Sequence, residues 1–465
     1  MAETTEITDM AAANERVNDG LFSFIAASPT AFHAVDTISA RLRAEGFVQL
    51  QEGARWELAP GRDVFVTRNG SSVIALRIGE QVKDCSFRIV AAHSDSPTFK
   101  LKEMAELEVQ DHHYTQLDTE GYGGMICASW FDRPLSIAGR VLLTDGGPES
   151  GPKTVSETRL ETRLVRFDRD LVLIPNVAIH FNRQVNDGYA YNRQVDLLPL
   201  FGGKGCGAGT LMRLLAEELG VAEEAILGSD LYLYDRAPGS VWGAGREFIS
   251  VGRLDDLQCV YAGLEAFLAG RDPYGITVLA VFDNEEVGSG TKQGAGSTFL
   301  PDVLRRVSRA LGFNEEDFSR GQASSFLLSA DNAHAVHPNH PEKTDALNHV
   351  FMNEGVVLKS HAGQKYTSDA LSAALVKTLA QRAGVPLQYF ANRSDMAGGS
   401  TLGNIAMAQL SMNAADIGLP QLAMHSVRET AGAADTAYMI ALMTEYYRTH
   451  LEAAADGQLR LVRAE

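Results

Sequence analysis

The segment Val278-Leu279-Ala280-Val281-Phe282-Asp283-Asn284-Glu285-Glu286-Val287-Gly288-Ser289-Gly290 decides the fold of this chain. Its first five residues are apolar and predict a buried strand, which runs directly into two adjacent carboxylates and a glycine turn. Carboxylates delivered to a sheet edge by a buried strand cost stability unless a cation or a proton compensates them. Open α/β sheets also place their sites at the carboxyl ends of strands. We therefore interpret Glu285 and Glu286 as functional residues, with a solvated acidic turn as the alternative.

Composition limits the class of protein and its partners. With 465 residues, the chain is long enough for two or three domains of about 150 residues each. A net charge of −18 argues against nucleic acid or an anionic membrane as a partner, because both require basic surfaces. Four scattered cysteines indicate reduced thiols. Residues 1–18 lack the apolar core of a signal peptide, and no apolar run is long enough to span a bilayer, so we expect a cytoplasmic protein.

The order of predicted elements favours an α/β fold. Apolar periodicity predicts helices within about the first forty residues and at 255–269, 299–312, 369–383, 403–409 and 433–448, with strands at 64–66, 72–78, 87–92, 276–282 and 325–330. Such repeated βα units imply a mainly parallel sheet flanked by helices. Residues 103–245 instead alternate and are broken by glycines, including Gly146-Gly147, which predicts a β-rich insertion domain. The predicted domains are therefore 1–102 with 246–465, and 103–245.

Several further polar side chains stand where an apolar run ends. His93 and Asp95 follow the strand at 87–92, Asp331 follows the strand at 325–330, His425 follows Leu422-Ala423-Met424, and Asp255 opens a helix. Each has an ordinary alternative: a core or surface histidine, a helix cap for Asp255, or a turn for Asp331. Together with Glu285 and Glu286, however, they form the ligand set that two adjacent zinc ions need. Because the set contains no thiolate, it favours a catalytic hydrolytic site over a structural one.

The segments that carry these residues resemble those of the aspartyl aminopeptidase family, a branch of the co-catalytic dizinc metalloaminopeptidases. They are AAHSDSP, VGRLDD, DNEEVGSG, SADNAHAVHPN and LAMHSVRE, in the family's order. The resemblance extends from about residue 20 to about residue 450, insertion included. It implies a zinc-exopeptidase-like fold and hydrolysis of an N-terminal Asp or Glu from peptides. It also implies two divalent metal ions, Zn²⁺ foremost, although Co²⁺ and Mn²⁺ accept the same ligands.

The resemblance also implies a role for each residue of the set. Asp255 bridges both metals, His93 and Asp331 complete one site, Glu286 and His425 complete the other, Glu285 is the general base, and Asp95 orients His93. Two positions depart from the family's pattern, of which Asn332, an amide that other members need not have, disturbs no assigned role. Asp256 replaces the neutral residue expected beside the bridging acid, which leaves open whether Asp255 or Asp256 bridges the metals.

Selectivity for an acidic first residue requires local positive charge in this acidic protein. On residue type alone Lys359 is a solvated surface lysine, but the resemblance implies that it binds the substrate carboxylate. Tyr366, His334 and His180 are implied to line the same pocket. His180 lies within the insertion and would reach a catalytic site only across a subunit boundary. The resemblance further implies that the insertion mediates dimer contacts within a homo-oligomer, a tetrahedral dodecamer.

Two rival functions remain open from the sequence. One is an aminopeptidase or deacylase of the same fold with another side-chain preference. The other is a non-catalytic assembly protein, against which Glu285 speaks because a scaffold needs no general base. Nucleotide binding is not expected. The glycine clusters at 202–207 and 288–290 lack the spacing of a phosphate-binding loop.

Overall fold

The structure, a computed structural model, describes residues 2–144 and 158–463, and the side chains among them except those of 2–11 and 454. The predicted turn at Gly146-Gly147 lies outside these residues. The chain divides into two compact units. The first comprises the described parts of 1–95, 239–424 and 429–465, and the second those of 96–238 and 425–428. Among the described residues, no helix combines the length and the apolar character needed to cross a membrane.

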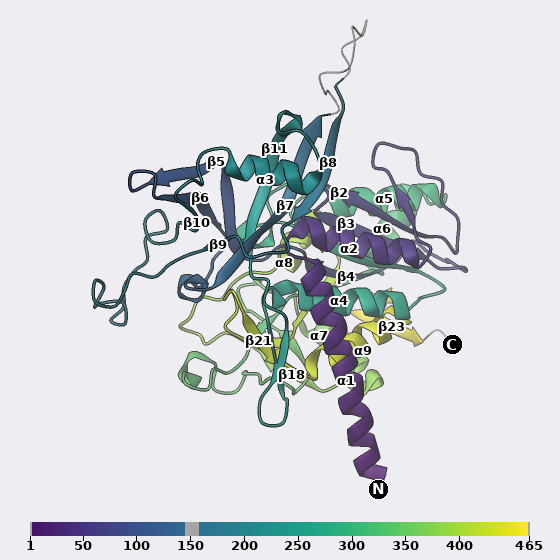
Figure 1. Cartoon of the computed structure of the whole chain (residues 1–465). Helices are drawn as coiled ribbons and strands as arrows, with labels where there is room; N and C mark the ends of the chain where they lie inside the picture. Colours follow the sequence, from purple (N-terminus) through teal and green to yellow (C-terminus); the bar gives the residue numbers. More distant parts are fainter. Residues whose placement is uncertain (1, 145–157, 464–465) are drawn as a thin grey trace, which may run out of the picture. The chain divides into compact units, whose positions relative to one another are not determined.

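A nine-stranded sheet forms the centre of the first unit (Figure 1). In spatial order its strands are β1 (Val48–Leu50), β2 (Asp63–Arg68), β3 (Ser72–Ile78), β14 (Ile276–Phe282), β4 (Phe87–His93), β15 (Phe326–Ala330), β19 (Asn413–Gly418), β17 (Val356–Lys359) and β18 (Leu387–Phe390). The pairs β1–β2, β14–β4, β4–β15, β15–β19 and β17–β18 are parallel, and the other three pairs are antiparallel. The mainly parallel sheet confirms the predicted fold class.

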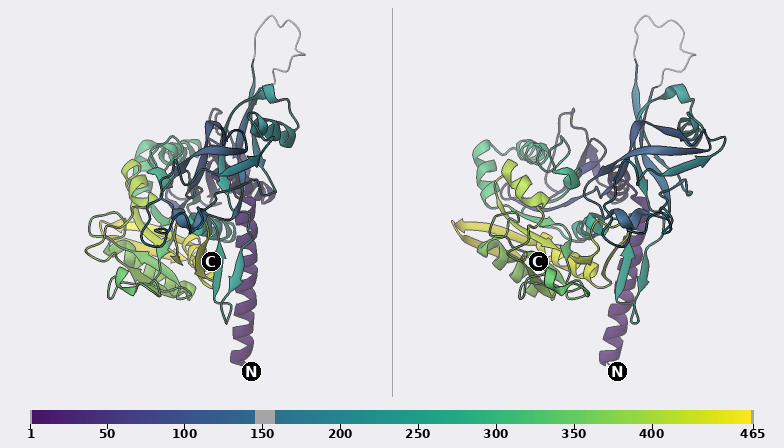
Figure 2. Two further views of the ribbon diagram at one scale, coloured as in Figure 1. Left: turned by 60° about the vertical axis from the view of Figure 1, so that its left-hand side comes forward. Right: turned by 90° about the vertical axis from the view of Figure 1, so that its left-hand side faces the viewer.

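Alternating side chains cover both faces of this sheet. In β14, Leu279 and Val281 join one buried cluster, whereas Val278 and Ala280 join another. The first cluster includes side chains of α1 (Ala2–Ala27), α2 (Ala31–Ala44), α4 (Leu254–Ala269), α7 (Ala370–Ala383) and α9 (Asp435–Tyr447). The second includes those of α5 (Phe299–Ala310), α6 (Glu315–Ala323) and α8 (Leu402–Gln409). The central strands β14, β4 and β15 are thus buried along their whole length because helices pack on both faces of the sheet, as Figure 2 also shows.

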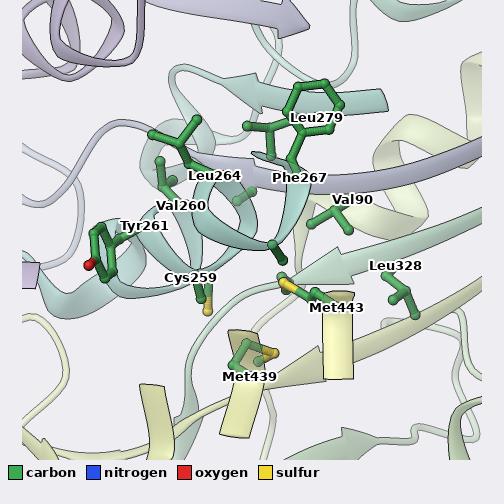
Figure 3. Close-up of a cluster of buried hydrophobic side chains, with 14 of the residues drawn as sticks. Val90, Cys259, Val260, Tyr261, Leu264, Phe267, Leu279, Leu328, Met439 and Met443 are labelled. Carbon is green, nitrogen blue, oxygen red and sulfur yellow. The ribbon is translucent and has the colours of Figure 1, made fainter. Parts of the chain in front are cut away.

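Helix α4 packs at the heart of the first cluster. Val260, Leu264 and Phe267 project from it among Val90 and Leu279 of the sheet, as Figure 3 shows. Met439 and Met443 of α9 complete the contact, and all seven side chains are fully or almost fully buried. This packing fixes the first turn of α4, which carries Asp255, against the central strands.

Two smaller sheets complete the first unit. A five-stranded sheet contains β12 (Ser240–Trp242), β13 (Phe248–Val251), β21 (Glu429–Gly432), β20 (Pro420–Leu422) and β16 (Ala333–His334), and a hairpin contains β22 (Thr449–Ala455) and β23 (Gln458–Arg463). The buried Arg88 of β4 ties the hairpin to the central sheet. Its guanidinium donates hydrogen bonds to the backbone carbonyls of Thr449 and Leu451, and it lies 3.5 Å from Asp272 Oδ2.

The second unit is built mainly of strands. Its seven-stranded sheet contains β11 (Ile226–Tyr234), β5 (Thr98–Val109), β6 (Tyr114–Tyr122), β10 (Leu200–Gly203), β9 (Val172–Leu173), β7 (Pro134–Thr144) and β8 (Leu160–Arg166). One helix, α3 (Thr210–Leu219), packs Leu211 and Leu215 into the core of this unit. The β-rich insertion predicted from the sequence is therefore present.

Candidate metal centre

The carboxyl ends of three neighbouring parallel strands meet at one edge of the central sheet. His93 is the last residue of β4 and pairs with Phe282, the last residue of β14. Asp331 follows β15 directly. Beyond β14, the short 3-10 helix η3 (Glu285–Val287) carries Glu285 and Glu286. Parallel pairing therefore brings together polar side chains that are far apart in the sequence.

Ligand atoms of several of these residues converge. Those of His93, Asp255, Asp256 and Asp331 all lie within 4.8 Å of one another. His93 Nε2 and Asp255 Oδ1 lie 3.3 Å apart. Asp255 also offers an oxygen within 4.8 Å of one from Glu286. Asp255 thus belongs to two groups of candidate ligands.

Hydrogen bonds fix these side chains in place. His93 Nδ1 lies 3.0 Å from the backbone carbonyl of Asp95 and 3.4 Å from its carboxylate, which leaves Nε2 toward Asp255. The two oxygens of Asp95 accept hydrogen bonds from the backbone N–H groups of Glu285 and Glu286, each at 3.2 Å. Asp95 therefore links the strand that carries His93 to the turn that carries the two glutamates.

The first turn of α4 departs from helical geometry at Asp255 and Asp256. The backbone N–H of Asp255 donates to Glu429 Oε2 at 3.0 Å. Asp256 is fully buried, and its Oδ2 accepts a hydrogen bond from the backbone N–H of His93 at 3.1 Å. The sequence left open whether Asp256, and not Asp255, bridges the metals. The structure places its carboxylate within the cluster, where it holds the backbone of His93.

Burial and mutual repulsion disfavour the charged forms of these acids. Burial is the main cause that raises the pKa of Glu285 to about 8, that of Asp331 to about 6, and those of Glu286 and Asp256 well above their usual values. Burial lowers the pKa of His93, but Asp256 and its other acidic neighbours raise it, so that it lies above its ordinary range.

The donor set suits a divalent cation. It combines carboxylate oxygens and one imidazole nitrogen at short mutual distances, and these are the ligands that zinc accepts in catalytic sites. A bound cation would remove the cost of burying several carboxylates together. The ammonium of Lys359 lies 3.9 Å from Asp331 Oδ2 and balances a single negative charge.

Lys359 is buried rather than solvated, which residue type alone did not indicate. Its Nζ donates to the backbone carbonyl of Asn332 at 2.7 Å and lies 5.4 Å from the ring centre of the buried Tyr366. Burial lowers the pKa of Lys359, but Asp331 and other neighbours raise it above its ordinary value, so the side chain stays charged. A fixed positive charge therefore lies beside the acidic cluster.

Sequence reasoning undervalued Asn332. This residue is buried, and its side chain accepts a hydrogen bond from Cys259 Sγ and donates to Gln258 and Gln421. Its carbonyl accepts the hydrogen bond from Lys359. Asn332 thus joins α4, β17 and β20 behind Asp331. Only its position next to Asp331 in the sequence could have drawn attention to it.

A cavity of about 300 Å³ opens beside these elements in the first unit. His334, Asn392 and Met424 line it, together with the side chains of Lys343 and Arg393. No aspartate or glutamate is among its described lining residues, in a protein of net charge −18. Arg393 Nε pairs with Asp395 Oδ1 at 2.8 Å, so the cavity is suited to an anionic group chiefly at Lys343. Lys359 and Tyr366 are not among its lining residues.

Two of the predicted site residues belong to the second unit. His425 lies on the loop between β20 and β21, and its Nδ1 is 2.5 Å from the carbonyl of Gly124. His180 is exposed in the long segment after β9, which has no regular structure around it. The geometry of the first unit alone thus unites His93, Asp95, Asp255, Glu285, Glu286 and Asp331.

Comparisons with known proteins define the class to which this fold and this centre belong. Residues 24–447 match the profile of the family described as "Aminopeptidase I zinc metalloprotease (M18)". The chain is 44% identical over 431 residues to a probable M18 family aminopeptidase 2 of Clostridium novyi, covering 92% of this chain and 97% of that protein. It is 40% identical over 438 residues to the protein of the same description in Pseudomonas aeruginosa, covering 93% and 98%.

Solved structures with similar folds point to the same family. The "Ape4 and Nbr1 complex" contains a chain with a TM-score of 0.89 and 35% identity, covering 94% of this chain and 86% of that one. The dodecamer of S. cerevesiae mApe1 gives a TM-score of 0.79 and 25% identity, covering 94% and 97%. This chain belongs to the M18 family of zinc aminopeptidases, and it is therefore a metal-dependent peptide hydrolase.

Proposed function

We propose that this M18 aminopeptidase binds two zinc ions and releases an N-terminal Asp or Glu from peptides. The observation that carries the proposal is the convergence of His93, Asp255, Asp331 and Glu286 at the carboxyl edge of the central sheet. Asp255 is shared by both groups of ligand atoms, which suits a carboxylate that bridges two ions. Because Asp256 Oδ2 is engaged by the backbone of His93, we favour Asp255 over Asp256 as that bridge.

We propose His425 as the remaining ligand, partner to Glu286. The loop that bears it leaves β20 and returns at Glu429, whose carboxylate accepts the hydrogen bond from Asp255. Both ends of the loop thus lie in the catalytic unit. The contact of Nδ1 with the carbonyl of Gly124 leaves Nε2 for a metal, the arrangement that commonly orients a ligating histidine.

Glu285 is the proposed general base. Metal ions in such a site lower the pKa of a bound water and polarise the scissile carbonyl. Glu285 accepts the proton from the water and donates it to the leaving amine, a role that suits a carboxylate beside the proposed metal ligand Glu286. Asp95 contributes by fixing both the imidazole of His93 and the backbone of Glu285. The two carboxylates at 285 and 286 therefore divide the work between proton transfer and metal binding.

Replacement of Glu285 by glutamine tests this assignment. The variant should keep two zinc ions per chain, because Glu285 is not a proposed ligand, while kcat falls by about 10²–10⁴-fold. Zinc is measured by elemental mass spectrometry and kcat with an N-terminal Asp peptide. Glu316→Gln, an exposed glutamate in α6, is the matched control and should retain full activity. Full activity of Glu285→Gln would refute the general base, and loss of one zinc would make Glu285 a ligand.

The proposed acidic preference depends on two sources of positive charge. One is the cavity whose described lining residues include Lys343 and Arg393 but no carboxylate. The other is Lys359, the partner of the substrate carboxylate implied by resemblance, with Tyr366, His334 and His180 as further pocket residues. The structure adds that Lys359 contacts Asn332 and lies near Asp331. Replacement of Lys359 by a neutral residue should therefore lower the selectivity for acidic residues and weaken metal binding by Asp331.

A panel of peptides that differ only in an N-terminal Asp, Glu, Leu or Lys tests the preference. We expect kcat/KM to be highest for Asp and Glu, and Lys359→Met to reduce the ratio of Asp to Leu cleavage. A wild-type preference for Leu would refute the acidic selectivity and support the rival aminopeptidase. An unchanged ratio with weaker zinc binding would show that Lys359 acts only through Asp331.

We also propose that the protein is cytoplasmic and forms a homo-oligomer of twelve subunits, a dodecamer. The support is the dodecamer formed by the similar mApe1. In this proposal residues 1–102 and 246–465 form the catalytic domain, and 103–245 form the oligomerisation domain that presents His180 to a neighbouring subunit. Light scattering measures the assembly. A monomer that retains full activity would contradict the role of the insertion.

A further inference from the structure

A pocket lined by arginines lies in the first unit, on elements that do not belong to the metal centre. It has a volume of about 230 Å³. Four of its lining residues are arginines: Arg68 at the end of β2, and Arg305, Arg306 and Arg309 on α5. The spacing of three and four residues places the helical arginines on one face of α5. Glu52, Asp302 and Val303 complete the lining.

Aromatic rings hold three of these guanidinium groups in place. Arg306 lies 3.6 Å from the ring centre of Trp56, Arg68 lies 4.3 Å from that of Phe299, and Arg305 lies 4.9 Å from that of Phe318. Stacking of this kind is favourable and limits the motion of a long side chain. The pocket is therefore pre-organised, so that binding orders few further groups.

Hydrogen bonds use only part of the donor capacity of the cluster. Each guanidinium offers five N–H donors. Arg306 donates to the carbonyls of Glu52 and Ala54, and Arg68 donates to the Glu52 carboxylate. Arg305 Nε lies 3.4 Å from Glu315 Oε2, which leaves the terminal N–H groups of Arg305. Donors thus remain for a ligand.

Positive charge also exceeds negative charge locally. Two carboxylates line the pocket, and Glu315 outside it contacts Arg305 and Arg309. Hydrogen bonds from Arg309 hold the pKa of Glu315 below its usual value. Arg305 and Arg309 keep exposed side-chain fractions of 43% and 64%, so an anion can reach them from solvent. A cationic pocket in a protein of net charge −18 requires an explanation.

We propose that this pocket binds a phosphate group, either inorganic phosphate or the phosphate of a small ester. Arginine pairs bind phosphate oxygens through charge-assisted, often bidentate hydrogen bonds. The ligand would contact Arg305 and Arg309 and compete with the carboxylate of Glu52 for Arg68. By joining β2, α5 and the loop at 52–56, it would stabilise the native protein in proportion to its concentration. The proposal does not depend on the peptidase specificity.

Calorimetric titration of the zinc-loaded protein with phosphate, at constant ionic strength, tests the site. We expect saturable binding to the wild type and affinity weakened by about tenfold or more in Arg305→Gln/Arg309→Gln. Glu52→Gln should change affinity in the opposite direction, by about threefold or more, because Arg68 loses its competing carboxylate. Phosphate that binds at the zinc centre contributes equally to all variants and so cancels. Glycerol phosphate distinguishes an ester from the free anion.

Arg382→Gln in α7 and Glu316→Gln in α6 are matched controls, since both residues are exposed and neither lines the pocket. Both should bind phosphate like the wild type. Equal affinity of the wild type and the double variant would overturn the proposal, as would the absence of binding to the wild type. Unchanged or weaker binding to Glu52→Gln would also contradict it. Thermal melting without phosphate verifies that each variant is folded.

Discussion

Gly418, the last residue of β19, shows how tightly the backbone behind the metal centre is packed. A Cβ atom added at this position would lie 2.1 Å from the carbonyl oxygen of Asp331 and 2.9 Å from Cε of Lys359. Real Cβ atoms essentially never approach another heavy atom closer than 3.0 Å. Gly418→Ala must therefore displace the backbone of Asp331 by about 1 Å, because the interior is close-packed and leaves no space for the methyl group.

The magnitude of the effect follows from that displacement. Metal-ligand distances tolerate deviations of only about 0.2 Å, so a shift of about 1 Å in Asp331 should weaken metal binding by roughly 10–100-fold. A misplacement of this size should also lower kcat/KM by about 10²-fold. The overpacked methyl group should destabilise the fold by about 1–3 kcal/mol, which leaves most molecules folded.

The assay combines kcat/KM for an N-terminal Asp peptide with zinc retained after dialysis against a chelator. Gly228→Ala in β11 is the matched control, because a Cβ atom there would meet no other atom within 4 Å. It should behave as the wild type in both measurements. Wild-type zinc retention and activity in Gly418→Ala would show that the strand end is not close-packed against Asp331, and would refute the reasoning.

Further predictions concern stability and metal dependence. Leu279→Ala should lower the free energy of unfolding by about 2–5 kcal/mol, because Leu279 is fully buried between α4 and the sheet; chemical denaturation measures it, and a loss below about 1 kcal/mol would contradict the packing. Burial is the main cause that raises the pKa of Asp435 to about 7, so this group stabilises the fold at low pH and that stability is lost as pH rises from about 4 to about 7. The denaturation midpoint of the wild type minus that of Asp435→Asn should fall over this window and then stay constant. A value that rises with pH would contradict the raised pKa. Chelation should abolish peptidase activity and added zinc should restore it, whereas activity that survives complete removal of metal would exclude a metal-dependent reaction.

Much of the fold could be predicted because the central elements have strong local patterns. The strand at 276–282 and the helix at 255–269 match β14 and α4 within one residue, since the apolar run at 278–282 and a helical apolar period differ clearly. Strands β17, β18 and β19 were not predicted. They have four to six residues each, and β19 reads Asn413-Ala-Ala-Asp-Ile-Gly418, so tertiary pairing rather than local pattern determines them.

Some residues of the candidate site could be selected from the sequence and others could not, for a related reason. Strand ends are visible in sequence, so His93, Asp331 and the pair at 285–286 could be selected before their proximity was known. Burial is not visible for a polar residue. The pattern therefore gave no sign that Asp256 and Lys359 are almost completely buried, or that Asn332 connects three elements. Such residues become interpretable only when the packing around them is known.

The hydrogen bonds from Arg88 to the carbonyls of Thr449 and Leu451 have a consequence for folding. They join β4 to residues that follow Arg88 by 361 and 363 positions in the sequence. Contacts this distant in sequence close a large loop, so the buried guanidinium gains these two acceptors only when distant parts of the first unit have come together. The strand that ends in His93 is therefore completed by the same long-range packing that holds the hairpin in place.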